Sequence, residues 1–386
     1  MRPYPRPAGA PPVAGPARDT VIRILHVADV HLGARFSGLG AKGGEQREQL
    51  RRTFVRCVDL ALERHCQVVL VAGDLFDTPH PPRSVASFAA DQLRRLAQAG
   101  VRVFAVAGNH DAAPDGVWKR PDFLGRAEGV VVFGEQPEAV HLDFGLVVVG
   151  RSATPGQNPL EAWPRPRGPA VGVVHGPLYR PGQVEDPAAI RPDQIRAVGL
   201  DYLALGDWHS AQEVHGPPHV SWYAGAPEFL SLDQPGFGHV LLVTVEAPGK
   251  VQVEPVRVAR RRYQRLAVSV EGLDDEVLRA QLEELADPEL VLDLTLQGLR
   301  EADQVFSLHA LQQDYGDRFF RLVLRDLSHP RLDEEALQRF EPATVLGQFV
   351  RRMQSRLQAS GPEERPYLEE ALQLGVAALQ GRGVHG

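Results

Sequence analysis

Short apolar runs that end abruptly in polar clusters dominate the first 250 residues of this chain. Written with the polar residues that follow them, five of these runs are VIRILHVADVH, QVVLVAGDLFD, VRVFAVAGNHD, AVGVVHG and DYLALGDWH. Their hydrophobicity is continuous rather than alternating, which is typical of strands that are covered on both faces. Helical patterns at residues 45–65 and 84–99 lie between several of the runs. The pattern therefore predicts an α/β fold built on a layered sheet.

The pattern changes near residue 260. Residues 263–325 alternate short strands with two helices, which predicts a small α+β module. Two apolar stripes at i, i+3/i+4 spacing follow, in residues 343–358 and 367–379. They fit either packing within the chain or a docking surface for a partner.

These changes divide the chain into four parts. We predict a disordered Pro-rich tail (1–20), a first domain (21–260), a small α+β domain (261–330) and a C-terminal helical segment (331–386). A stretch rich in Gly and Pro, residues 154–170, predicts a long loop within the first domain.

Composition places the chain among water-soluble globular proteins. Of its 386 residues, 43% are hydrophobic and 24% charged, and no apolar run approaches the ~20 residues of a membrane span. The N-terminus lacks the apolar core of a secretory signal, and the two cysteines offer no disulfide framework, so we expect a cytoplasmic protein. The net charge of −7 hides an asymmetry, because residues 1–267 carry +3 and residues 268–386 carry −10.

The chemistry-bearing residues follow the ends of the predicted strands, where open α/β sheets bind their ligands. They are Asp29, His31, Asp74, Asn109, His110, Asp111, His175, Asp207 and His209. Carboxylates, imidazoles and an amide, without a thiolate, form a site for ions such as Mn, Fe, Zn or Mg. There are too many candidate ligands for one ion, so we expect two ions bridged by a carboxylate. His26 lies inside the first run and is expected in the core.

Five motifs, DVH, GDLFD, GNHD, a lone His after a strand, and GDWH, resemble those of the calcineurin-like metallophosphoesterases. Within that superfamily, the chain resembles the SbcD-type DNA repair exonucleases. The motifs cover residues 21–246. The resemblance implies a layered β-sandwich core flanked by helices, a small α+β capping domain and a helical C-terminal tail.

The resemblance also implies two divalent ions, with Mn²⁺ expected and Mg²⁺, Fe or Zn²⁺ as alternatives. One ion would be held by Asp29, His31 and His209. The other would be held by Asn109, His175 and Asp207. Asp74 would bridge the two.

The implied catalytic residues are His110 and Asp111. His110 would donate a proton to the leaving oxygen, with its other nitrogen oriented by Asp111, and such acid help contributes typically ~10²–10⁴ in rate. Asp77, which closes GDLFD, either positions a ligand or phosphate contact or is a turn residue before Pro79.

One position departs from the family pattern. The family usually reads GHxH, whereas this chain has Asp207 at the first His position. A carboxylate can ligate a divalent ion, but it is shorter than imidazole and charged. The departure affects the metal preference and the affinity of the second site. Alternatively, Asp207 does not bind the metal and instead caps a helix N-terminus or contacts one of the ligands.

The leading hypothesis is a DNA nuclease that uses a hydroxide activated by the two ions. The segments SWYAGAPE and GFGHVLLVTVE, the layout of the last ~120 residues and the terminal ALQLGVAALQG resemble SbcD-like proteins. That resemblance implies a homodimer and an SMC-like ATPase of SbcC type, bound through the C-terminal helices. The alternatives are a small-molecule phosphodiesterase or phosphatase, and a DNA-binding scaffold subunit with weak catalysis.

Basic residues just after the first motif are candidates for phosphate contacts, although a solvated surface explains them equally well. They are Arg35, Lys42, Arg47, Arg51, Arg52 and Arg56.

Overall fold

The structure is a computed structural model that describes residues 2–3, 21–182, 186–231, 234, 236–247, 249–301 and 304–381. It divides into two compact units, Met1–Arg262 and Tyr263–Gly386. Within the predicted Pro-rich tail only β1 (Arg2–Pro3) is described, and the rest of residues 1–20 lies outside the described residues. Among the described residues, no helix combines the length and apolar character that crossing a membrane requires.

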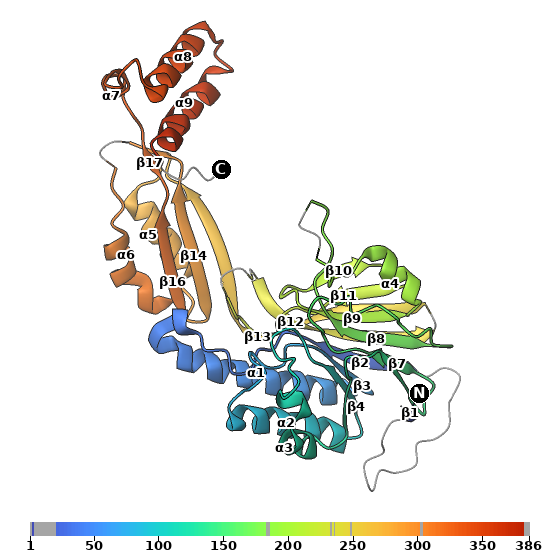
Figure 1. The fold of residues 1–386 in the computed structure, drawn as a ribbon. Helices are drawn as coiled ribbons and strands as arrows, with labels where there is room; N and C mark the ends of the chain where they lie inside the picture. Colours follow the sequence, from blue (N-terminus) through green and yellow to red (C-terminus); the bar gives the residue numbers. More distant parts are fainter. Residues whose placement is uncertain are drawn as a thin grey trace. The chain divides into compact units, whose positions relative to one another are not determined.

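Two sheets form the first unit (Figure 1). In the first, the strand order β13-β12-β2-β3-β4-β5 holds a parallel block, β2 to β5, with β12 antiparallel to β2. Its strands are β2 (Ile22–Val27), β3 (Val68–Ala72), β4 (Arg102–Val106), β5 (Val130–Val132), β12 (Gly236–Ala247) and β13 (Lys250–Ser269), the last of which continues into the second unit.

The second sheet has the order β1-β6-β7-β8-β9-β11-β10 and is parallel from β7 through β8 and β9 to β11. Its other strands are β6 (Glu138–His141), β7 (Val147–Gly150), β8 (Ala170–His175), β9 (Tyr202–Gly206), β10 (Gln212–His215) and β11 (Val220–Tyr223). Residues 151–169 contain neither helix nor strand, which confirms the predicted long loop.

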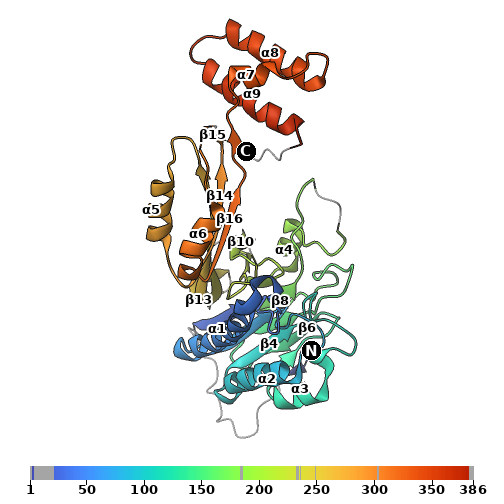
Figure 2. The ribbon, with the colours of Figure 1, turned by 90° about the vertical axis from the view of Figure 1, so that its left-hand side faces the viewer.

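Several helices cover the outer face of the first sheet, and one short helix packs on the second in the described part of the unit (Figures 1 and 2). The helices of this unit are η1 (Ser37–Lys42), α1 (Gly43–Glu63), α2 (Arg83–Gln98), η2 (Val117–Lys119), α3 (Pro121–Arg126) and α4 (Pro192–Val198). Helices α1 and α2 confirm the helical patterns at 45–65 and 84–99. The predicted α/β class and the sandwich flanked by helices are therefore confirmed.

Strand β3 shows why the apolar runs are continuous. Val68, Leu70 and Ala72 belong to the cluster between the two sheets. Val69 and Val71 belong to the cluster that packs under α1 and α2. Because successive side chains of a strand point to opposite faces, a strand buried on both faces must be apolar at every position.

The second unit begins with a small α+β arrangement. Strands β13, β14 (Leu290–Gln297) and β16 (Arg321–Asp326) form the sheet, and β14 pairs with β16 in parallel. Helices α5 (Asp275–Leu285) and α6 (Leu308–Tyr315), followed by η3 (Gly316–Arg318), pack on it through one apolar cluster. Strands β15 (Leu299–Arg300) and β17 (His329–Pro330) form a short separate pair.

The chain ends in three helices, α7 (Glu334–Gln338), α8 (Val345–Ala359) and α9 (Arg365–Leu379). The two predicted apolar stripes meet each other, because Val350, Leu372 and Val376 are buried in one small cluster. A Cβ on Gly375 would lie 2.2 Å from Cζ of Phe349, so this glycine lets α8 and α9 approach closely. The stripes therefore pack within the chain, as the first of the two alternatives expected.

His26 lies on β2 inside the sandwich, which confirms the prediction that it belongs to the core. Its Nδ1 lies 2.8 Å from the hydroxyl of Tyr202 on β9, so the pair links the two sheets. Burial without a charge partner lowers the pKa of His26 to about 3.

The pKa of His26 predicts a specific loss of stability in acid. The pKa of His26 is about 3 in the folded protein and near 6.5 in the unfolded one. Neutral His26 therefore makes its full contribution to the free energy of unfolding above pH 6.5, and this contribution is lost as the pH falls toward 3. Between pH 7 and pH 5 the loss is about 2 kcal/mol. In His26→Gln, the amide still meets the Tyr202 hydroxyl but does not titrate, so its free energy of unfolding should depend less on pH by that amount.

Urea unfolding of both proteins at pH 7 and pH 5, in a chelator, measures this difference. Other titrating groups are common to the two proteins and cancel. Equal pH dependence in the two proteins would contradict the assignment.

Candidate metal centre

The ends of five strands bring the predicted ligands together. Asp29 and His31 follow β2, and Asp74 follows β3, while His175 ends β8. Asp207 and His209 follow β9. The loop after β4 supplies Asn109, His110 and Asp111. Carboxyl ends of parallel strands from both sheets therefore meet at one edge of the sandwich.

Four of these residues have a positive φ angle: it is 110° at Asp207, and the other three lie in the left-handed helical region. The φ angles are 51° at Asp29, 50° at His31 and 47° at Asp74. Non-glycine residues adopt this region rarely, at a cost of order 1–3 kcal/mol each, and such strain is concentrated at functional sites. Hydrogen bonds between the two loops hold the conformation, since the amides of Asp29 and His31 donate to the carbonyls of Gly73 and Asp74.

The first predicted set of ligands is assembled. One side-chain donor atom from each of Asp29, His31 and His209 lies within 4.8 Å of the others. The Nδ1 of His31 lies 3.3 Å from a carboxylate oxygen of Asp77. Because the other ring nitrogen then faces the cluster, Asp77 fits the role of a ligand-orienting residue rather than a plain turn residue.

The second predicted set surrounds one atom, Nε2 of His175. The side-chain oxygen of Asn109 lies 2.7 Å from this nitrogen, and Oδ1 of Asp207 lies 3.7 Å from it. Nδ1 of His175 is 3.0 Å from the carbonyl oxygen of Ala72, to which it donates when protonated. That hydrogen bond fixes the ring so that Nε2 points into the site.

Asp74 stands between the two sets. Its Oδ2 lies 3.6 Å from Nε2 of His31 and 3.4 Å from Nε2 of His175. Its Oδ1 accepts the amide of His110 at 2.9 Å. One carboxylate oxygen that faces a ligand of each set has the position that a bridging carboxylate needs.

Two orphaned atoms support the fit of this cluster to divalent ions. Oδ2 of Asp29 and Nε2 of His31 are buried and make no hydrogen bond among the described residues. A buried polar atom without a partner costs free energy, so an unexplained pair in one cluster indicates a missing ligand. The donor set is carboxylate, imidazole and amide, which suits ions such as Mn²⁺, Mg²⁺, Fe or Zn²⁺.

His110 and Asp111 differ in their burial and in their contacts. His110 is exposed, and its ring centroid is 4.7 Å from that of His31. Asp111 is fully buried, and its two carboxylate oxygens accept the amides of Gly108 (2.7 Å) and Phe76 (3.1 Å). These contacts tie the loop after β4 to the loop after β3. The structure thus gives Asp111 a bracing role, and the expected orientation of the His110 ring by Asp111 stays a prediction.

Burial and mutual charge shift the pKa values of the cluster. Burial raises the pKa of Asp29 to about 7 and also raises that of Asp207. Burial alone would lower the pKa of His175, but the carboxylates of Asp74, Asp29 and Asp207 outweigh it and raise the value to about 9. These directions hold for the protein alone, in which protons offset the clustered negative charge.

A cavity of about 440 Å³ opens beside the second set of ligands. Asn109, His175 and Asp207 line one side, and the long loop lines another through Thr154 to Gln157 and Pro159. The sequence predicted only a loop there. A single buried guanidinium holds it: Arg151 donates to the side chain of Gln157 at 2.5 Å and to the carbonyls of Glu135, Asn158 and Glu161.

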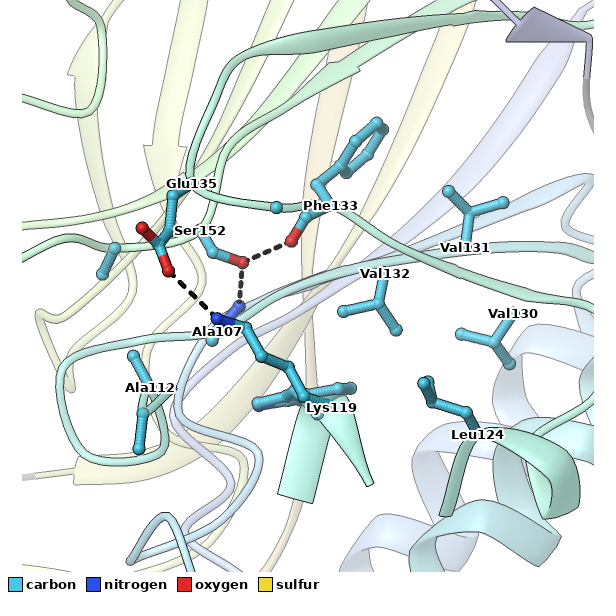
Figure 3. Close-up of a pocket in the computed structure, with 14 residues that line it drawn as sticks. Ala107, Ala112, Lys119, Leu124, Val130, Val131, Val132, Phe133, Glu135 and Ser152 are labelled. Atoms are coloured by element: carbon cyan, nitrogen blue, oxygen red, sulfur yellow. Dashed lines mark hydrogen bonds and ion pairs between the residues drawn. The ribbon is translucent and has the colours of Figure 1, made fainter. Parts of the chain in front are cut away.

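A second, apolar pocket of about 320 Å³ shares Ala112 and Ala153 with that cavity. Figure 3 shows Val130, Val131, Val132 and Leu124 on its walls. An ion pair between Lys119 and Glu135 (3.1 Å) lies at one side, and Ser152 bridges the amide of Ala107 and the carbonyl of Phe133. No residue of this lining belongs to a candidate metal cluster among the described residues, so we place the chemistry at the neighbouring cluster.

Comparison with known proteins gives a family match and distant relatives. Residues 22–211 match the family model described as calcineurin-like phosphoesterase. The DNA double-strand break repair protein Mre11 of Methanopyrus kandleri is 28% identical over 290 residues, covering 67% of this chain and 62% of that protein. The protein of the same name from Sulfurisphaera tokodaii is 23% identical over 294 residues, covering 72% of this chain and 73% of its own length.

Among solved structures, the crystal structure of TT1561 of Thermus thermophilus matches with a TM-score of 0.38 and 14% identity, covering 62% of this chain and 100% of that one. This chain spans about three fifths of the length of the Methanopyrus kandleri relative.

The position of Asp207 generates a test of its metal role. Asp207→Asn removes one negative charge and keeps the shape of the side chain and its tolerance of the positive φ of 110°. If Asp207 is a ligand, we expect the second Mn²⁺ to bind at least ~10-fold more weakly, because the attraction between the ion and a nearby full charge is lost. Calorimetric titration with Mn²⁺ measures both affinities.

Asp186→Asn is the matched control, because Asp186 lines the same cavity and is not one of the proposed ligands. Asp207→His should still bind two ions and should tolerate Zn²⁺ better, with a pH optimum moved down. Wild-type affinity for both ions in Asp207→Asn would remove Asp207 from the ligand set.

Proposed function

We propose that this protein, whose residues 22–211 match the calcineurin-like phosphoesterase family model, is a metal-dependent nuclease that hydrolyses phosphodiester bonds of DNA. The observation that carries the proposal is the strand-end cluster, in which Asp74 faces a ligand of each of two sets and two buried donor atoms lack partners. A two-ion site of this kind is built to hold a phosphoryl group. The names of the Mre11 relatives favour DNA as the substrate.

In this proposal, Asp29, His31 and His209 hold one divalent ion, and Asn109, His175 and Asp207 hold the other, with Asp74 between them. When bound, the ions supply Lewis acidity and lower the pKa of water. Asp77 and the carbonyl of Ala72 orient the rings of His31 and His175 so that one nitrogen of each faces the ions. We propose Mn²⁺ as the working ion, because three carboxylates make the donor set hard.

His110 is the proposed general acid. Its ring is exposed beside His31, and its backbone is fixed by the hydrogen bond from its amide to Asp74. An exposed imidazole next to the ligands can reach the leaving oxygen of a bound diester and give it a proton. Asp111 supports this position by holding the loop that carries His110.

The basic residues near α1 add little support for DNA binding. Arg52 lies 3.5 Å from Glu48, and Arg56 lies 2.7 Å from Glu63. Arg47 donates to the carbonyl of Arg35. These local contacts favour the solvated-surface interpretation of this cluster.

Hydrolysis assays separate the three candidate functions. We expect the Mn²⁺-loaded protein to degrade single- or double-stranded DNA and also to cleave bis(4-nitrophenyl) phosphate. Cleavage of the small diester without any on DNA would favour a small-molecule phosphodiesterase. A protein that binds two ions and DNA but hydrolyses neither substrate would favour the scaffold alternative.

The role of His110 is tested in the same assays. His110→Ala should lose at least ~10²-fold in rate and retain both ions, because a general acid is removed and no ligand is lost. Elemental analysis after desalting counts the ions, and His31→Ala, which removes a proposed ligand, is the control for metal loss. One missing metal equivalent in His110→Ala would reassign this residue as a ligand.

We further propose a cytoplasmic homodimer that works with an SMC-like ATPase of SbcC type. Two buried free cysteines fit a reducing compartment. The proposed ATPase contact is the outer surface of α8 and α9, where Val345 and Tyr367 are 74% and 75% exposed. Val345 begins α8 and Tyr367 lies in the first turn of α9, so the proposed contact runs along the length of the helix pair.

The ATPase contact predicts the effect of a double variant. Val345→Asp combined with Tyr367→Ser should weaken binding of a purified SbcC-type ATPase at least ~10-fold and leave hydrolysis of the small diester unchanged. Val277→Asp, on the exposed surface of α5, is the control. Unchanged affinity in the double variant would exclude this surface.

A further inference from the structure

Trp208 occupies an unusual place in the metal centre. It lies between the proposed ligands Asp207 and His209, in the loop that follows β9. Its side chain is 40% exposed, and it is the aromatic one among the large hydrophobic side chains exposed in the described part of the first unit. An indole held beside the site without being buried does not contribute to the core.

Arg180 lies over this indole. The guanidinium carbon of Arg180 is 4.1 Å from the centroid of the Trp208 ring, within cation–π distance. Arg180 is exposed and comes from the segment after β8, so two strand-end loops supply the pair. The guanidinium keeps the indole in one orientation and offers a second flat surface.

The pair lines a pocket of about 170 Å³ that reaches the metal centre. Asp207, Gln212 and Tyr223 complete much of its lining. Asp207 also lines the 440 Å³ cavity beside the second set of ligands, so the two hollows adjoin at this carboxylate. A group joined to a phosphate in the site can therefore lie against Trp208.

We propose that Trp208 and Arg180 form a stacking platform for an unpaired nucleobase next to the scissile phosphate. This proposal rests on the proposed nuclease function and names the part of the substrate that the site recognises. Aromatic rings and guanidinium planes both stack on bases, because every base has a flat π-face. The positive charge of Arg180 also suits a polyanionic strand.

The platform selects unpaired bases rather than a base sequence. Inside a duplex both faces of a base are covered by its neighbours, so stacking of an internal base on a protein ring requires an unpaired nucleotide. Stacking is tolerant of base identity. The site should therefore favour single-stranded or frayed DNA and cleave different sequences at similar rates.

Trp208→Leu removes the aromatic face and keeps an apolar side chain. Stacking of one base on an aromatic side chain predicts a loss of about 5- to 150-fold in kcat/KM on a single-stranded oligonucleotide. Trp208→Phe should retain most of the activity, since a ring remains. Arg180→Gln should lose part of it.

Oligonucleotides in which one abasic nucleotide is moved across the cleavage position separate stacking from a structural effect. At the position next to the scissile phosphate, wild type should lose activity, and Trp208→Leu should lose nothing further. Arg257→Gln is the matched control, because Arg257 also lies over an aromatic ring, that of Phe237, and is absent from the lining of the pocket. Metal content is measured for every variant.

Binding without catalysis gives an independent readout. In a chelator, titration with a single-stranded oligonucleotide should quench the fluorescence of wild type more than that of Trp208→Phe, and an abasic oligonucleotide should remove the difference. A wild type that cleaves no DNA rejects the nuclease function, while the quenching still tests the platform. The platform is rejected if Trp208→Leu loses the same factor on normal and abasic strands, or if quenching is the same in both proteins.

Discussion

The close approach of five strand ends is the constraint on which the rest of the site depends. A Cβ on Gly206 would lie 1.9 Å from the carbonyl oxygen of Ala72, and a Cβ on Gly108 would lie 2.2 Å from Oδ1 of Asp74. Only glycine fits at such distances, so the two sheets approach closely at Gly206, and the loops after β3 and β4 approach closely at Gly108, where the ligands emerge. The left-handed turns at Asp29, His31 and Asp74 then direct the side chains into the space between the sheets. A larger residue at Gly206 or Gly108 would move the two ligand sets apart and would change the hydrophobic core less.

The sequence predicted the strands and the ligand cluster because both follow from local pattern. A strand buried on two faces is apolar at every position, so β2, β3, β4, β8 and β9 stand out, and the polar residues that end them must share an edge. The partners of Asp111 were not predictable in this way. Its carboxylate binds the amides of Gly108 and Phe76, and the second contact depends on how two loops fold together. The same holds for Arg151, which fixes the long loop through carbonyls that carry no sequence signal.

Charge explains why so many acids can share a buried site. Asp29 is fully buried and Asp74 nearly so, and Asp207 adds a third carboxylate within 3.7 Å of His175. In the protein alone, the raised pKa values of Asp29 and His175 show that protons balance this charge. Divalent ions neutralise the same carboxylates with two positive charges each and replace the protons, so their binding must release protons. The metal-loaded fold is therefore favoured as the pH rises, until hydroxide competes for the ions.

The proposed ligand cluster fits a phosphoester site and leaves the substrate open, because the same fold serves several chemistries. The distinction has to come from the walls around it. Here those walls are a loop pinned by Arg151 on one side and an indole under a guanidinium on the other. Neither the loop nor the Trp208–Arg180 pair supplies a proposed metal ligand. The pair lines a hollow together with Asp207, and the loop lines the cavity that Asp207 also lines. Position 207 thus joins two properties of the site, since a residue that contributes to its negative charge also lines the hollow beside Trp208.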